Sequence, residues 1–146
     1  MKTVLLIDDD QFFLEPLADA LESQGHKVIK ARDAQTGLEL LTQHHVDLVT
    51  IDIMLDPGES NQDKVKSTET GLFLCKEIRR RYPQLDAFCI SVHSDRDIIR
   101  EVQSLRIRFL SKGETPLRTV LNMLNSRLTG IAYSSERPRR QVPDRP

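Results

Sequence analysis

Residues 4–10 read VLLIDDD, four aliphatic residues followed directly by three aspartates. A continuous aliphatic run of this length is typical of a β-strand that is covered on both faces of a sheet. The aspartates follow the carboxyl end of that strand. This stretch therefore predicts a buried strand that presents carboxylates at one edge of a sheet.

Further runs rich in β-branched and aliphatic residues follow the first one, and segments with helical spacing of apolar residues separate them. This alternation over residues 3–130 indicates an α/β fold with a parallel sheet. The predicted strands are Thr3–Ile7, Lys27–Ala31, Leu48–Ile51, Ala87–Ser91 and Ile107–Leu110.

Three of the intervening helices have recognisable ends. The first is expected over residues 11–24, with Pro16 just past the first turn, where a proline bends a helix. Asp33 is a candidate N-cap for a helix that runs to about residue 43. For the last helix, Thr115 is the expected N-cap, Pro116 the first helical residue and Gly130 the end.

Composition excludes several classes of protein. The chain has 146 residues, 38% of them hydrophobic, and its 22 acidic and 21 basic side chains leave a net charge of -1. We expect one domain, no membrane span because no apolar run reaches roughly 18 residues, and no nucleic-acid partner because no basic excess exists. Two cysteines and no signal-peptide pattern favour a cytoplasmic location, with both thiols as packing residues.

Two segments are expected to differ from the rest. Residues 59–69 read ESNQDKVKSTE, which predicts an extended loop at 56–70 beside the carboxyl end of the third strand. Residues 131–146 hold four arginines and three prolines, and we expect this tail to be disordered. The predicted folded domain is 1–130.

Residues whose side chains can bind ligands or react follow the predicted strands. Asp8 and Asp9 follow the first strand, Asp52 the third and Lys112 the fifth, while Ser91 ends the fourth. Each alone has a structural explanation, such as capping the next helix. Ligands of open parallel sheets bind at the carboxyl ends of the strands, so together these residues predict one site.

The chemistry of such a site is phosphoryl transfer. Converging carboxylates repel one another unless a cation joins them, and Mg²⁺ suits an oxygen site of this kind. Asp52 is then a candidate acceptor that forms an aspartyl phosphate, with the Lys112 ammonium and the Ser91 hydroxyl neutralising the phosphoryl oxygens.

Four segments resemble the CheY-like receiver domain of two-component response regulators over about residues 1–130. They are VLLIDDD at 4–10, VDLVTIDIML at 46–55, ISVHS at 90–94 and FLSKG at 109–113. The resemblance implies a five-stranded parallel sheet in the order 2-1-3-4-5 with helices on both faces.

The resemblance also implies roles for individual residues. Asp52 would be phosphorylated by a histidine kinase or a phosphotransfer protein, and Lys112 and Ser91 would bind the phosphoryl group. Ser91 and Phe109 would act as the switch, and a plain core phenylalanine on an edge strand is the serious alternative for Phe109. The implied Mg²⁺ ligands are Asp8, Asp9, Asp52 and the backbone carbonyl of Met54.

Some features depart from the family pattern. A twelve-residue segment separates Gly58 from Gly71, and it controls access of a kinase, contacts a partner or is a tolerated surface insertion. Gly113 follows Lys112 where proline is common in the family, which leaves the cis geometry of that bond open. His93 and Met54 are candidates for tuning hydrolysis of the acyl phosphate, and His93 could equally be an ordinary loop residue.

Three functions follow from these observations. The first is a single-domain phosphorelay switch that signals to a separate effector protein, because few residues follow position 130. The second is a silent receiver-fold adaptor. The third, an aspartate-nucleophile phosphatase, needs a second aspartate where Met54 stands. We therefore expect a signalling protein rather than an enzyme, capable at most of self-phosphorylation and of losing its own phosphoryl group.

Overall fold

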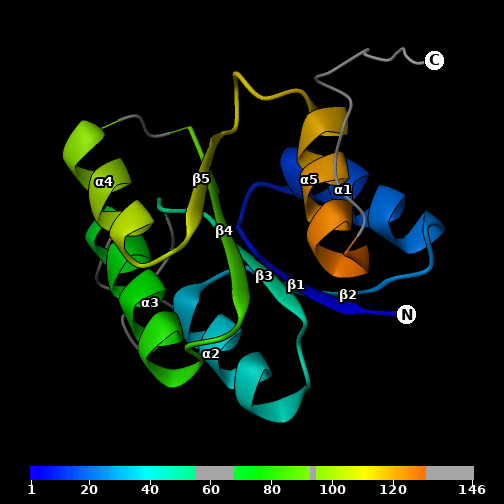
Figure 1. The fold of residues 1–146 in the computed structure, drawn as a ribbon, viewed down its shortest axis with the longest axis horizontal. Helices are drawn as coiled ribbons and strands as arrows, with labels where there is room; N and C mark the ends of the chain where they lie inside the picture. Colours follow the sequence, from blue (N-terminus) through cyan, green and yellow to red (C-terminus); the bar gives the residue numbers. More distant parts are fainter. Residues whose placement is uncertain (55–67, 93–94, 131–146) are drawn as a thin grey trace, which may run out of the picture.

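The computed structural model describes residues 1–54, 68–92 and 95–130. Within them strands and helices alternate along the chain, as Figure 1 shows. The elements are β1 (Thr3–Ile7), α1 (Gln11–Ser23), β2 (Lys27–Ala31), α2 (Ala34–Gln43), β3 (Leu48–Ile51), α3 (Thr68–Arg81), β4 (Asp86–Ser91), α4 (Arg96–Ser104), β5 (Arg108–Ser111) and α5 (Leu117–Thr129).

The five strands form one parallel sheet in the order β2-β1-β3-β4-β5. This confirms the predicted fold class. The first three strands begin and end where predicted, whereas β4 begins one residue earlier and β5 is shifted by one residue. Ile107 is fully buried in the core, but pairing with β4 starts only at Arg108, opposite Phe88.

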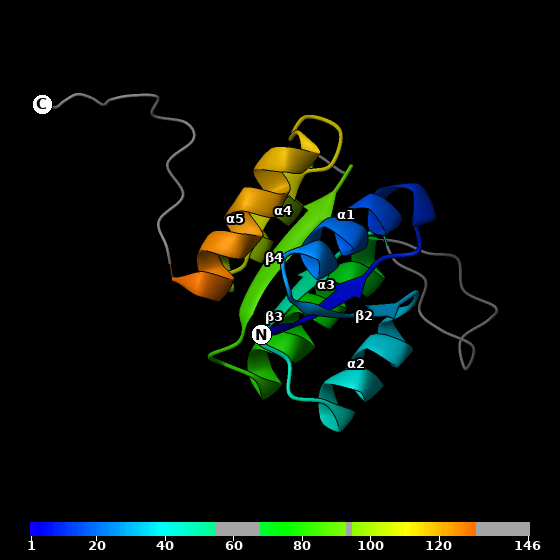
Figure 2. The same ribbon diagram turned by 90° about the vertical axis from the view of Figure 1, so that its right-hand side faces the viewer.

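The helices form a layer on each face of the sheet (Figures 1 and 2). Helices α1 and α5 pack together on one face, and α2, α3 and α4 cover the other. Alternate residues of β1 therefore enter different cores: Val4 and Leu6 pack under α1 and α5, while Leu5 and Ile7 pack under the other layer. Burial on both faces explains the continuous apolar runs of β1 and β3.

Aspartates cap three of the helices, and the third is Asp95 at the start of α4. The Asp10 side chain accepts a hydrogen bond from the Phe13 amide, and the Asp33 side chain accepts one from the Thr36 amide. The predicted Thr115 cap of α5 is wrong. The Thr115 amide closes a turn onto the Ser111 carbonyl, so Pro116 takes the cap position without a side-chain hydrogen bond.

Helix α3 begins earlier than the polar sequence suggested. Residues 68–70 of the predicted 56–70 loop belong to its first turn, so that boundary is wrong. Apolar residues at helical spacing start only after this turn, which is why the sequence reads as loop there. The remainder of the expected loop, residues 55–67, and the expected disordered tail, residues 131–146, lie outside the described residues.

Gly71 sets how closely α3 approaches the sheet. A Cβ atom at this position would overlap the backbone carbonyl oxygen of Ile53. Only glycine allows this contact between a helix backbone and the residue that follows Asp52. The position of α3 is therefore tied directly to the chain segment that carries Asp52.

Two further expectations concern the backbone and the membrane. The peptide bond between Lys112 and Gly113 is trans, as are the other peptide bonds of the described ranges. In the described part of the chain, no helix combines the length and the apolar character that crossing a membrane requires.

Candidate functional site

The sheet brings the predicted site residues to one edge. Backbone hydrogen bonds continue the parallel pairing past the strand ends: the Asp8 amide donates to the Ala31 carbonyl, and the Asp52 amide donates to the Ile7 carbonyl. At the neighbouring pair of strands, β4 and β5, the Lys112 amide donates to the Ser91 carbonyl at 2.8 Å. The carboxyl ends of β1, β3, β4 and β5 thus place these side chains in a row.

Three carboxylates converge in this row. Oxygen atoms of Asp8, Asp9 and Asp52 all lie within 4.8 Å of one another. Asp8 is 2% exposed and Asp52 is 6% exposed, so water screens their mutual repulsion poorly. Burial and then the charge of Asp52 raise the pKa of Asp8 to about 7. An oxygen-only cluster with this shortage of positive charge fits a divalent cation.

Backbone amides orient the two buried carboxylates. The Met54 amide donates to Asp52 Oδ1 at 3.1 Å, and the Asp10 amide donates to Asp8 Oδ1 at 2.9 Å. These bonds leave the Oδ2 atoms of both aspartates facing Lys112. The cluster is therefore positioned by the local backbone that follows each strand.

Lys112 directly follows β5 and reaches across the site. Its Nζ lies 2.8 Å from Asp8 Oδ2 and 3.5 Å from Asp52 Oδ2. Burial opposes the charged form of this side chain, but the hydrogen bond to Asp8 and the charges of Asp52, Asp8 and Asp10 outweigh it and raise the pKa of Lys112. The ammonium is thus charged and placed beside the candidate acceptor.

Two contacts of Lys112 were not predicted. Asp10 Oδ2 lies 3.5 Å from Nζ, and the Phe13 ring lies 4.8 Å from it in a cation–π arrangement. Asp10 also caps α1, through the hydrogen bond that it accepts from the Phe13 amide. The signal in the sequence was the third consecutive aspartate, but nothing in the sequence locates a lysine 102 positions away.

The remaining candidate residues lie around this centre. Ser91 is fully buried at the end of β4. Phe109 and Met54 are half-buried and pack against the core under α2, α3 and α4. Phe109 pairs with Cys89 in the sheet register, two positions before the Ser91 pair. His93 lies outside the described residues.

The two cysteines lie behind the site. Cys75 of α3 and Cys89 of β4 are free and fully buried in the same core, which confirms their interpretation as packing residues. A hydrogen bond with Cys75, burial and the nearby Asp52 charge raise the pKa of the Cys89 thiol. The Cys89 thiol therefore stays protonated at neutral pH.

Known proteins resemble the chain in sequence and in fold. The response regulator receiver domain family matches residues 4–123. The transcriptional regulatory protein AfsQ1 of Streptomyces coelicolor is 34% identical over 95 residues, which make up 65% of this chain but only 37% of that protein. The polar-differentiation response regulator DivK of Brucella ovis is 26% identical over 100 residues, 68% of this chain and 76% of that protein.

The solved structures agree with this match. A CheY-like response regulator receiver domain protein from Methanospirillum hungatei has a TM-score of 0.74 and covers 89% of this chain, with 95% of its own length covered. The non-phosphorylated HemR receiver domain from Leptospira biflexa also has a TM-score of 0.74 and covers 88% of this chain, with 95% of its own length covered. Their sequence identities of 19% and 21% mean that these likenesses concern the fold alone.

Proposed function

The chain belongs to the response regulator receiver domain family, and from this premise we propose that Asp52 accepts a phosphoryl group from a histidine kinase or a phosphotransfer protein. One observation supports this most directly. Lys112 Nζ lies within 3.5 Å of Asp52 Oδ2, beside two more carboxylates at metal-binding distance. One site therefore holds the candidate acceptor Asp52, the Lys112 ammonium and a carboxylate cluster that would bind a second cation.

Asp8, Asp9 and Asp52 would hold Mg²⁺, with the backbone carbonyl of Met54 as a further ligand. The three side chains offer only oxygen atoms, which Mg²⁺ prefers. Once bound, the ion would neutralise charge on the transferring phosphoryl oxygens. It would also offset the repulsion between Asp8 and Asp52, which acts with burial, the larger cause, to raise the pKa of Asp8 to about 7.

In the proposed transfer, an Asp52 carboxylate oxygen uses an electron pair to form the new bond to phosphorus. The bond between phosphorus and the imidazole nitrogen of the donor breaks, and the nitrogen keeps that electron pair. Lys112 then exchanges its contact with Asp8 for a phosphoryl oxygen, and the Ser91 hydroxyl donates to another. The product is an aspartyl phosphate, a mixed anhydride that water hydrolyses.

The signal would pass to a partner protein. Movement of the Ser91 hydroxyl toward the phosphoryl group would change the packing around Phe109, which is half-buried on the edge strand β5. We propose residues 1–130 as the switching unit, acting in the cytoplasm between a kinase and a separate effector. The family is one of signalling domains, and beyond self-phosphorylation and loss of its own phosphoryl group we propose no catalytic turnover.

A mass measurement tests the phosphoacceptor. The protein is incubated with Mg²⁺ and acetyl phosphate, and intact mass is recorded at intervals. We expect a single labile phosphoryl adduct that requires Mg²⁺ and is absent from Asp52→Asn. Asp95→Asn is the matched control, because Asp95 caps α4 and is not one of the three clustered carboxylates, so the adduct should remain.

The alternatives give different results. If no adduct forms with acetyl phosphate or with histidine kinases, the silent adaptor replaces the switch. Multiple turnover of diverse phosphate esters would instead identify a phosphatase. An adduct that survives Asp52→Asn would move the acceptor to another residue.

A further inference from the structure

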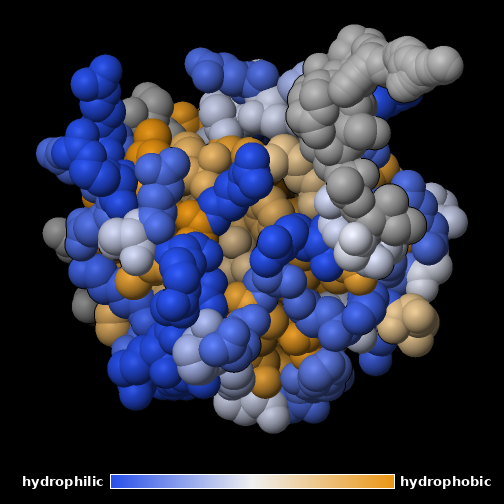
Figure 3. Space-filling model, viewed as in Figure 1, coloured by the Kyte–Doolittle hydropathy of each residue, from blue (hydrophilic) through white to orange (hydrophobic). Residues whose placement is uncertain are grey.

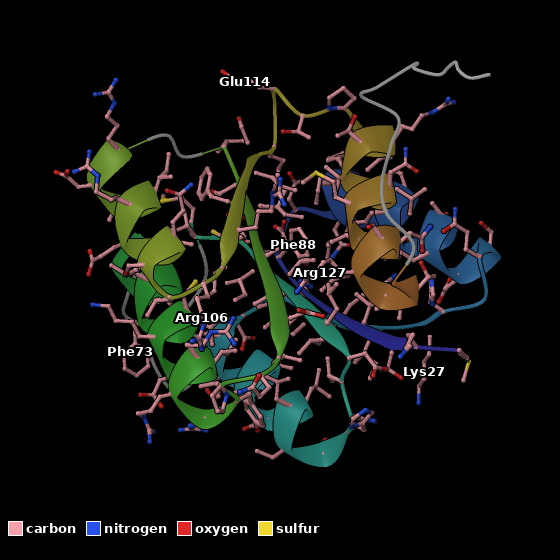
Figure 4. The ribbon with its side chains drawn as sticks, in the orientation of Figure 1. Lys27, Phe73, Phe88, Arg106, Glu114 and Arg127 are labelled. Carbon is pink, nitrogen blue, oxygen red and sulfur yellow. The ribbon has the colours of Figure 1, made fainter. Side chains whose placement is uncertain are left out.

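The Lys112 side chain turns inward, although polar surface lies next to it. Lys112 follows β5, and Figure 4 shows Glu114 at this end of the strand and Arg106 at the other. In the same orientation, Figure 3 shows hydrophilic residues at the Glu114 end, above the hydrophobic centre of this face. A lysine in such a place can extend into water, yet only 7% of the Lys112 side chain is exposed. Contacts inside the site therefore hold the ammonium.

Two of these contacts are with carboxylates that have other proposed roles. Asp8 and Asp52 lie 2.8 Å and 3.5 Å from Lys112 Nζ, and both are proposed metal ligands. In the proposed transfer, the ammonium leaves Asp8 for a phosphoryl oxygen. Its position beside Asp52 then depends on groups that take no part in this exchange.

Asp10 and Phe13 are groups of this kind, and both lie at the start of α1. Asp10 Oδ2 lies 3.5 Å from Lys112 Nζ, and the centroid of the Phe13 ring lies 4.8 Å from it, within the range of a cation–π interaction. The other carboxylate oxygen of Asp10 accepts a hydrogen bond from the Phe13 amide at 3.3 Å. This helix cap ties the carboxylate to the backbone that carries the ring.

The core also holds the Phe13 ring. Phe13 is half-buried and packs against the core under α1 and α5, on the same helix face as the buried Leu17 and Leu21. Packing alone explains an apolar residue at this position, but a leucine would serve that purpose equally well. An aromatic ring adds a face of negative charge, and here this face lies against an ammonium that is largely removed from water.

We propose that Phe13 is a positioning residue for Lys112, whose ring keeps the ammonium beside Asp52 while the contact with Asp8 is exchanged for a phosphoryl oxygen. The inference rests on the proposed function, because Lys112 acts there on the transferred group. Without the ring, the ammonium would stay with Asp8 or turn toward water, and phosphorylation would slow. Phe13 acts only through Lys112 in this role.

The rate of phosphorylation tests the proposal. The full chain is incubated with Mg²⁺ and acetyl phosphate, and intact mass gives the rate of adduct formation. Phe13→Leu should slow this rate about fivefold, the loss expected from a partly desolvated cation–π contact. Phe12→Leu is the matched control, because the adjacent phenylalanine is 93% exposed and its loss should change the rate less than about twofold.

Fluorinated rings separate the cation–π contact from packing. Phenylalanine that carries one, two or three fluorine atoms is incorporated at position 13. Fluorine withdraws electrons from the face of the ring but preserves its apolar character and nearly its size. The rate should therefore fall with each added fluorine while the melting temperature stays constant. The same series at position 12 should leave the rate unchanged.

A measurement without Mg²⁺ or phosphodonor tests the contact itself. Protons above an aromatic ring are shifted upfield, so the ε-methylene signals of Lys112 in ¹³C correlation spectra should lie upfield of those of the exposed Lys2. Phe13→Leu should abolish this shift, and Phe12→Leu should preserve it.

The outcomes distinguish this inference from the proposed function. Equal rates of adduct formation in wild type and Phe13→Leu would overturn the positioning role but leave Asp52 as the acceptor. A rate that falls in Phe13→Leu but not in the fluorinated series would reduce Phe13 to a packing residue. If the wild type forms no adduct, the proposed function fails, and the positioning role in phosphoryl transfer fails with it. Unshifted ε-methylene signals in the wild type would refute the contact independently of phosphorylation.

Discussion

Asp8 is the residue whose environment differs most from that of a carboxyl group in water. It is 2% exposed, lies beside Asp52 and receives Lys112 Nζ at 2.8 Å. Burial and then the charge of Asp52 raise the pKa of Asp8 to about 7, and they outweigh the opposing effect of the contact with Lys112. Without a metal, the folded state therefore binds a proton that the unfolded state releases at lower pH.

This difference predicts that stability falls as pH rises. An unfolded aspartate has a pKa of about 3.9, so between about pH 4 and pH 7 the folded state holds more protons than the unfolded state. Unfolding then releases protons and becomes easier at higher pH, by on the order of 4 kcal/mol over the whole window. Urea unfolding in EDTA at pH 5 and pH 8 measures the larger part of this loss.

The variant Asp8→Asn isolates the contribution. The free energy of unfolding of this variant should be nearly independent of pH over this window, once the contributions of the other titratable groups are subtracted. Mg²⁺ should restore stability to the wild type at pH 8 far more than at pH 5, because it binds the ionised cluster. Parallel pH dependence in wild type and variant would show that another group carries the effect.

At the scale of elements, the contact between α3 and the segment after β3 is the tightest constraint on the site. We predict that Gly71→Ala lowers the free energy of unfolding by about 2 kcal/mol, because the new Cβ overlaps the Ile53 carbonyl oxygen and α3 must shift. Phosphorylation of Asp52 by acetyl phosphate should also slow, since Ile53 is its neighbour in the chain. Urea unfolding and the rate of adduct formation measure the two effects.

Gly113→Ala is the control for this substitution. A Cβ at Gly113 would meet no atom within 4 Å. The free energy of unfolding of Gly113→Ala should therefore differ from that of the wild type by no more than about 0.5 kcal/mol. Similar losses in both variants would mean that the close approach of α3 does not constrain the fold.

At the scale of the whole molecule, Arg79 links segments that are distant in sequence. Its guanidinium donates to the carbonyls of Tyr82, Pro83 and Leu85 before β4 and to those of Leu105 and Arg106 before β5. One side chain of α3 thus satisfies carbonyl groups in two connections at the amino ends of the strands. Removing it would leave several half-buried acceptors without partners.

We predict that Arg79→Lys lowers the free energy of unfolding by about 2 kcal/mol, because an ammonium cannot reproduce five planar donor contacts. Urea unfolding measures it. Arg80→Lys, which changes an exposed arginine paired with Glu77, should cost no more than about 0.5 kcal/mol. Equal effects would refute a linking role for Arg79.

Much of this architecture could be predicted from the sequence, for a physical reason. Parallel strands buried on both faces need continuous apolar runs, so Thr3–Ile7 and Leu48–Ile51 were predicted with their observed ends. Because the carboxyl ends of such strands meet, the gathering of Asp8, Asp52 and Lys112 followed.

What was missed depends on contacts between distant segments. The polar first turn of α3 lacks an apolar pattern, and the turn that moves the α5 cap to Pro116 forms through the backbone. The contact of Asp10 with Lys112 could not be predicted, because the sequence does not place the lysine beside it. The raised pKa of Asp8 depends on the burial of Asp8, which only the folded structure shows. The arginines near the amino ends of β4 and β5 come from α3, from the segment around the start of β5 and from α5, whose proximity only the fold provides.

The placement of charge at the two ends of the sheet gives the molecule an electric dipole. Carboxylates gather at the carboxyl ends of the strands, arginines at the amino ends, and the net charge of -1 conceals this separation. A charged partner diffusing nearby would experience a torque and turn before contact, most strongly at low ionic strength. The acidic and basic poles would thus favour opposite orientations of approach for cationic and anionic partners.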